Sequence, residues 1–173
     1  PKRLMAEVLL DAISQVTEVP TPFTHIGFPG GDRQETKEYP LGTRAIQLHD
    51  SAIESYFLKT FGRNSRAITC ECERSDEPSM VQVLHVANGD TINGKLKTKE
   101  NRVSRLLAAG HSDVELSEEI FLHCLSRCPT EDEKTRVVEL LGQIDKGDAE
   151  EKRLVVEDVF WSLLSTREFL FNH

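Results

Sequence analysis

The last third of the chain carries the feature that most constrains its fold, a series of three amphipathic helical patterns. Apolar residues recur there every three or four positions, which is the spacing of one helix face. They are Leu116, Ile120, Phe121, Cys124, Leu125 and Cys128, then Val137, Val138, Leu140, Leu141 and Ile144, then Val155, Val156, Val159, Phe160, Leu163 and Leu164. Pro129 must end the first helix, Thr130 and Glu133 form a capping box for the second, and Gly147 precedes the third. Short links between such helices predict antiparallel neighbours around one core.

Helical spacing also dominates the rest of the chain. It predicts helices over residues 2–16, 51–61, 78–87 and 103–107, of which the last three are followed by Gly62, Gly89 and Gly110. Ser51 and Glu54 have the spacing of a capping box for the second of these helices. The tail at 168–171 is apolar enough that we expect it to dock on the bundle, and no alternating strand pattern competes. The sequence therefore predicts an all-α fold, an irregular multi-helix bundle that forms one domain over residues 1–173.

One segment near the N-terminus breaks this pattern. Residues 17–50 contain four prolines and four glycines and show no helical or strand period, so a long Pro/Gly-rich irregular loop is expected. Loops of this length are usually functional, disordered, or packed against something else. Because the sequence does not start with methionine, we interpret the chain as a fragment of a larger protein. The loop is then expected to be a docking surface for another part of that protein.

Charge and hydropathy exclude several classes of partner. The 21 basic and 29 acidic residues of this 173-residue chain give a net charge of −8, which disfavours binding to nucleic acid or to anionic membrane surfaces. No apolar run approaches the ~18 residues needed to cross a bilayer, so no membrane insertion is expected. Gly-x-Ser-x-Gly, P-loop, Gly-x-Gly-x-x-Gly, Cys-x-x-Cys-His and His-Glu-x-x-His patterns are all missing. The sequence therefore holds no catalytic motif and no haem attachment site, and it leaves open whether the protein is an enzyme.

A set of local strings, taken in order, is more specific than the periodicity. They are RLMAE at 3–7, CECERSDEP at 70–78, QVLH at 82–85, LSRCPTEDE at 125–133, EDVFWSLL at 157–164 and REFLFNH at 167–173. Together they resemble the C-terminal domain of unknown function of large exported planctomycete proteins, which often carry an N-terminal c-type cytochrome module. The resemblance implies an exported location, periplasmic or cell-surface, and other domains of the same polypeptide as partners. It implies haem only in that separate module, and it implies no reaction.

The turn at 70–74 is the most pointed candidate site. Cys70 and Cys72 cannot easily bridge each other, but both thiolates could bind a metal, or each could pair with Cys124 or Cys128. The plainer interpretation is two half-buried cysteines in a turn, or disulfides in an exported domain. Around them lie further candidates for a functional turn, namely Glu71, Glu73, Arg74 and His85. The carboxylates could serve as acid and base or bind a cation, although such charged runs are commonly solvated loops.

Two functional hypotheses follow. The first is a non-catalytic interaction or scaffolding domain of an exported, cytochrome-associated protein, because the sequence lacks catalytic motifs and has a long loop. The alternative is a domain that completes an active site shared with an upstream domain, for oxidative or hydrolytic attack on an extracellular polymer. In that case the Cys70–Cys72 turn would supply a metal or redox site. Convergence of these side chains on one pocket would favour the alternative.

Overall fold

A computed structural model describes residues 2–27, 31–49, 52–63, 90–145 and 147–171. Its elements are α1 (Ala6–Thr17), β1 (His25–Ile26), β2 (Gln34–Glu35), η1 (Ala45–Gln47), α2 (Tyr56–Thr60), α4 (Asp90–Leu96), α5 (Arg102–Ala108), α6 (Asp113–Leu125), α7 (Glu131–Gly142), α8 (Ala149–Leu164) and α9 (Arg167–Leu170). The protein is mostly helical, as predicted. The two-residue strands of the β1–β2 ribbon were not predicted, because two residues are too few to show an alternating pattern.

The C-terminal bundle of α6, α7 and α8 forms through local signals that the sequence displays. Thr130 and Glu133 make the predicted capping box at the start of α7, and Ser112 makes an equivalent box with Glu115 at the start of α6. Phe160 on α8 is fully buried at the centre of the bundle. One boundary differs from the prediction, because Ser126 adopts a left-handed conformation with φ 56° and ends α6 before residue 128.

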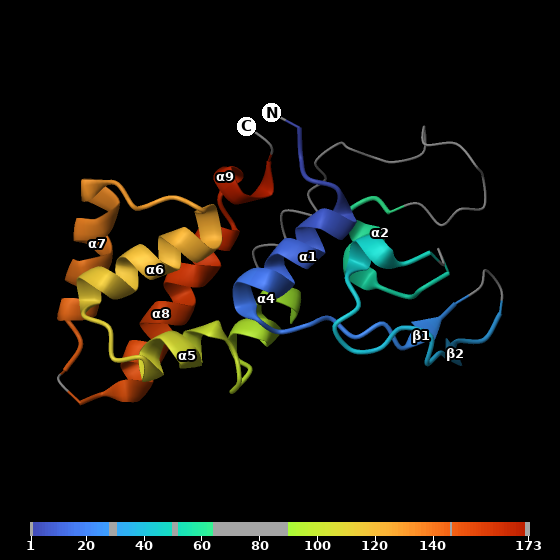
Figure 1. The fold of residues 1–173 in the computed structure, drawn as a ribbon, viewed down its shortest axis with the longest axis horizontal. Coiled ribbons are helices and arrows are strands. Elements are labelled where there is room, and N and C mark those ends of the chain that lie inside the picture. Colours follow the sequence, from blue (N-terminus) through green and yellow to red (C-terminus); the bar gives the residue numbers. More distant parts are fainter. Residues whose placement is uncertain (1, 28–30, 50–51, 64–89, 146, 172–173) are drawn as a thin grey trace.

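Helix α1 lies at the centre of the other half and packs against η1, α2, α4 and α5 (Figure 1). It begins at Ala6 rather than at residue 2, and Leu9, Leu10 and Ile13 on its inner face are at most 1% exposed. The predicted helix over residues 2–16 is therefore confirmed from Ala6 onward, while Met5 is exposed and precedes it.

The segment between α1 and α2 is anchored to α1 from a distance. Asp11 accepts hydrogen bonds from the backbone N–H groups of Ala45 (2.6 Å) and Ile46 (3.1 Å) at the start of η1. Phe23, Tyr39 and Leu48 of the same segment are buried in the core. The described part of this segment therefore contributes to the domain's own core.

One further helix boundary differs from the sequence prediction, one helix was not predicted, and the predicted helix over 78–87 lies outside the described residues. Helix α2 begins at Tyr56 with Ser55 as its N-cap, five residues after the predicted start at Ser51, which lies outside the described residues. Glu54, the other half of the predicted capping box, forms an ion pair with Arg33 (3.0 Å) instead. Helix α4 was not predicted, because its polar sequence shows a weak apolar stripe, with only Ile92 and Leu96 in the core.

The tail docks on the domain, as the sequence predicted. Phe169 of α9 is buried, and the backbone N–H of Leu4 donates to the carbonyl of Leu170 (3.0 Å). An antiparallel bridge joins Arg3 to Phe171, so the two ends of the described chain lie side by side (Figure 1). None of the described helices is both long and apolar enough to cross a bilayer.

Candidate functional site

All residues of the predicted cysteine turn lie outside the described part of the chain. They are Cys70, Glu71, Cys72, Glu73, Arg74 and His85. The metal or redox site proposed from them therefore stays a prediction. Within the described ranges, no three His, Cys, Asp or Glu side chains gather closely enough to hold a metal ion.

A pocket of about 450 Å³ lies along α5 and is a candidate site among the described residues. We call it the α5 pocket, and its lining residues are Glu18, Lys99, Glu100, Asn101, Ser104, Arg105 and Ala108. Positions 101, 104, 105 and 108 share one face of α5, because they follow the spacing i, i+3, i+4 and i+7. The volume falls in the range of small-molecule and peptide-side-chain pockets.

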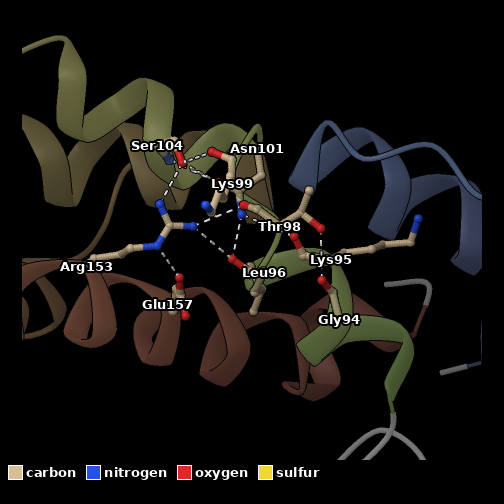
Figure 2. Close-up of polar contacts among 9 residues, drawn as sticks. All are labelled: Gly94, Lys95, Leu96, Thr98, Lys99, Asn101, Ser104, Arg153 and Glu157. Atoms are coloured by element: carbon tan, nitrogen blue, oxygen red, sulfur yellow. Dashed lines mark hydrogen bonds and ion pairs between the residues drawn. The ribbon is translucent and has the colours of Figure 1, made fainter. Parts of the chain in front are cut away.

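Two of the lining residues, Asn101 and Ser104, belong to a hydrogen-bond network around Arg153 of α8, whose guanidinium reaches across to the α4–α5 turn (Figure 2). Its Nε donates to Glu157, one turn later on α8 (2.7 Å). Its Nη1 donates to the hydroxyl of Ser104 (2.7 Å), and its Nη2 donates to the carbonyls of Thr98 (3.1 Å) and Leu96 (3.5 Å). A single half-buried cation on α8 therefore holds both sides of the turn.

Asn101 completes this network and is only 2% exposed. Its side-chain oxygen accepts from the backbone N–H of Ser104 (3.0 Å), which makes it the N-cap of α5. Its amide nitrogen donates to the carbonyls of Lys95 (3.1 Å) and Leu96 (2.5 Å), which end α4. The hydroxyl of Ser104 lies within hydrogen-bond distance of the carbonyl of Lys99 (2.6 Å). One asparagine thus begins α5 and closes α4, which explains why a buried polar residue is retained here.

The chemistry of this network is structural rather than catalytic. A serine nucleophile needs an adjacent base, and Ser104 instead accepts from Arg153 and lies against Asn101 and a backbone carbonyl. No histidine or carboxylate hydrogen-bonds to this hydroxyl within the described residues. The network therefore fixes the shape of the pocket and leaves Ser104 without activation.

Charges of both signs line the rim of the α5 pocket. Glu18, in a left-handed conformation directly after α1, binds Arg105 (2.8 Å) and Arg102 (3.0 Å). Lys99 and Glu100 are exposed, and neither side chain has an ion-pair partner among the described residues. The rim can therefore offer one cation and one carboxylate to a ligand or a protein surface without breaking an existing pair.

Lys95 lies beside the network but points away from Arg153 toward α1 (Figure 2). Its ammonium nitrogen donates to the carbonyl of Val19 (2.6 Å), and the residue is 7% exposed. Burial lowers the pKa of Lys95 to about 8, because a charged amine is poorly solvated there. This lysine links two segments that are 76 residues apart in the sequence.

A second polar cluster joins two of the strings that carry the family resemblance. Arg127 forms two hydrogen bonds with Glu133 at the start of α7 (2.8 and 2.9 Å) and two with Glu168 on α9 (2.6 and 2.8 Å). These bonds to Arg127 lower the pKa of Glu133 to about 2. The guanidinium also lies over the ring of Phe121. Both acids are used to fasten α9 to the α6–α7 link, so this cluster is structural.

Cys124 and Cys128, which were both predicted on the apolar face of one helix, differ in their exposure to solvent. Cys124 is buried on α6, as predicted, and burial raises the pKa of its thiol to about 12. Cys128 was predicted on the same helix face, but it is exposed in the link after α6, because the helix has already ended at Ser126. Both are free thiols.

Sequence reasoning missed the α5 pocket because its residues come from separate segments. One signal was available, since Asn101 stands immediately before the apolar run of α5 and has the residue type of an N-cap. The contributions of Glu18 and Arg153 had no such signal, because they depend on how α1 and α8 pack against α5.

The comparisons with known proteins give a family and no reaction. A family model described as "PSD1: Protein of unknown function (DUF1553)" matches residues 1–141. No curated protein and no solved structure matches the chain.

Proposed function

The chain belongs to the DUF1553 family of proteins of unknown function, and from this premise we propose that it is a non-catalytic helical interaction domain. The observation that carries the proposal is that the polar groups beside the α5 pocket hydrogen-bond to one another. Arg153, Asn101 and Ser104 all use their polar groups within the domain. The pocket therefore supplies shape and surface charge, which are means of recognition, rather than an activated nucleophile or base.

The proposed partner is another domain of the same polypeptide, and Lys99 and Glu100 are the proposed contact residues. Both side chains are exposed at the rim of the α5 pocket. A surface that presents an acid next to a base favours a partner that carries the opposite pair, because complementary charges set the orientation of docking. The resemblance in the strings supports a parent protein that is exported, of planctomycete origin and associated with a c-type cytochrome module.

Charge reversal at the rim tests the proposal. The double variant Lys99→Glu/Glu100→Lys keeps the net charge and reverses the proposed contact. We expect it to weaken association with the rest of the parent polypeptide by about tenfold, measured by isothermal titration calorimetry. The matched control is Arg136→Glu/Glu139→Lys on α7, where both side chains are exposed and lie far from the pocket in the sequence.

Four outcomes decide between the alternatives. Selective weakening by the rim variant, with the α7 control unchanged, supports the proposal. Equal affinity for both variants removes the α5 pocket from the interface, and no association at all contradicts an interaction domain of this kind. Stoichiometric metal in protein purified without chelator would instead favour the shared active site at Cys70 and Cys72.

A further inference from the structure

Arg102 connects three helices through one guanidinium group. It extends from the first residue of α5, and its Nε donates to the carbonyl of Val16 in the last turn of α1 (2.7 Å). Its Nη2 donates to the carbonyl of Gln15 (3.1 Å) and pairs with Glu18 (3.0 Å). Its Nη1 lies 3.0 Å from Nε2 of His123 on α6. Because the Arg102 side chain is only 13% exposed, its contacts are largely shielded from solvent.

The contact with His123 specifies a protonation state. An arginine side chain can only donate hydrogen bonds, so Nε2 of His123 must be the acceptor. The imidazole is therefore neutral in this arrangement and carries its proton on Nδ1. Once protonated, both ring nitrogens of His123 would carry protons, and Nε2 could no longer accept from Arg102.

A second partner for the protonated ring is already in place. A carboxylate oxygen of Glu119, one turn earlier on α6, lies 3.4 Å from the same Nε2. The neutral ring suits Arg102, and the charged ring suits Glu119. His123 therefore stands between a group that requires it neutral and a group that favours it charged.

The charges that act on His123 come from α5, α6 and the residue that follows α1. Burial and the positive charges of Arg102 and Arg105 lower the pKa of His123, while Glu119 and Glu18 oppose them with a smaller effect. Among the described residues, α7, α8 and α9 contribute no charge to this environment. The balance keeps the ring neutral near neutral pH and leaves it able to titrate as the pH falls.

We propose that the Arg102–His123 contact is an acid-released latch that joins the end of α1 to α6. Protonation of His123 places two cations about 3 Å apart and removes one of the hydrogen bonds that orient Arg102. The same guanidinium holds the carbonyls of Gln15 and Val16, so its displacement loosens the junction between α1 and the C-terminal bundle. This proposal does not rest on the partner proposed for the α5 pocket, although Glu18 belongs to both sites.

The sign of the effect follows from linkage. The pKa of His123 is lower in the folded protein than in the unfolded chain, so the unfolded chain binds the proton first as the pH falls. The stability contributed by the latch is complete above the ordinary histidine pKa of about 6.5 and is lost as the pH falls through the lowered value.

His123→Gln is the decisive variant, because the glutamine carbonyl can accept from Arg102 and does not titrate. We expect this variant to fold as the native chain does near pH 7.5. Between about pH 7.5 and pH 5, we expect the native chain to lose about 2–4 °C more of its melting temperature than the variant. Hydrogen exchange, corrected for its intrinsic pH dependence, should show the amides at the end of α1 becoming less protected in the native chain only.

Two further variants keep the test specific. His111→Gln, a histidine just before α6, is the matched control and should retain the full acid sensitivity of the native chain. Glu119→Gln removes the carboxylate that favours the charged ring of His123. The fall in melting temperature on acidification should therefore occur at lower pH in this variant. The proposal is overturned if His123→Gln keeps the native acid sensitivity, or if His111→Gln abolishes it to the same degree.

Discussion

The helices of the C-terminal bundle begin at local contacts, whereas the segments around α1 are positioned by remote ones. In the C-terminal bundle, the helices begin at N-caps whose partners are three residues further on, as between Thr130 and Glu133. Around α1, the polar contacts join residues that are distant in the sequence. The Asp11 carboxylate accepts from the backbone N–H of Ala45 at the start of η1, and these two residues are 34 positions apart. Lys95 donates to the carbonyl of Val19, which is 76 positions away. The comparison shows that one fold can combine locally specified helices with segments that take their positions from remote partners.

The largest expected effect concerns the remote contact of Lys95. Its pKa of about 8 in the folded protein lies below the ordinary lysine value, so the folded state releases its proton first as the pH rises. Between about pH 8 and pH 10.5, the native chain should gain about 3 kcal/mol of stability relative to Lys95→Met. Urea unfolding of both proteins at several pH values measures this difference. A constant difference across that range would show that the ammonium is not buried.

A smaller effect is expected from the local contact of Thr130. Thr130→Ala removes a side-chain acceptor at the start of α7 and should destabilise the protein by about 1 kcal/mol. Thr130→Ser keeps the hydroxyl and serves as the matched control, with stability close to that of the native chain. Urea unfolding provides the measurement. An alanine variant as stable as the serine variant would mean that α7 is not limited by its cap.

Labelling of Cys124 and Cys128, at the C-terminal end of α6 and just after it, examines a local boundary without a substitution. Cys128 is exposed and Cys124 is buried with a raised pKa, so a thiol reagent should label Cys128 quickly and Cys124 only after unfolding. Mass spectrometry of the labelled peptides separates the two sites. Rapid labelling of Cys124 in the folded protein would show that the C-terminal end of α6 opens readily.

Local signals explain which parts of the fold could be predicted from the sequence. The starts of α7 and α8 and the apolar faces of the C-terminal bundle follow from capping residues and helical period. The prediction that Cys128 lies on the apolar helix face was wrong. Nothing in the sequence pattern showed that Ser126 would adopt a left-handed conformation and end the helix early. Helix α4 was missed because its short, polar sequence forms a helix mainly through packing against α1 and α8.

The candidate site was less predictable than the fold. Asn101 could have been found as an N-cap, but the pocket is also lined by Glu18, which directly follows α1, and its Ser104 is held by Arg153 from α8. Arg153 lies 49 residues from Ser104, and no local pattern relates residues at such a distance. The cysteine turn is the reverse case, because Cys70 and Cys72 are easily found in the sequence but lie outside the described residues.

The pairing of the two chain ends has a mechanical consequence. The bridge between Arg3 and Phe171 is antiparallel, and the Leu4–Leu170 hydrogen bond lies one residue further in. A force that pulls residues 2 and 171 apart would load these contacts one after another, as in unzipping, rather than all together in shear. The bridge between the chain ends would therefore open at low force before tension reached α1 or α8, while α9 would stay fastened through Glu168 to Arg127.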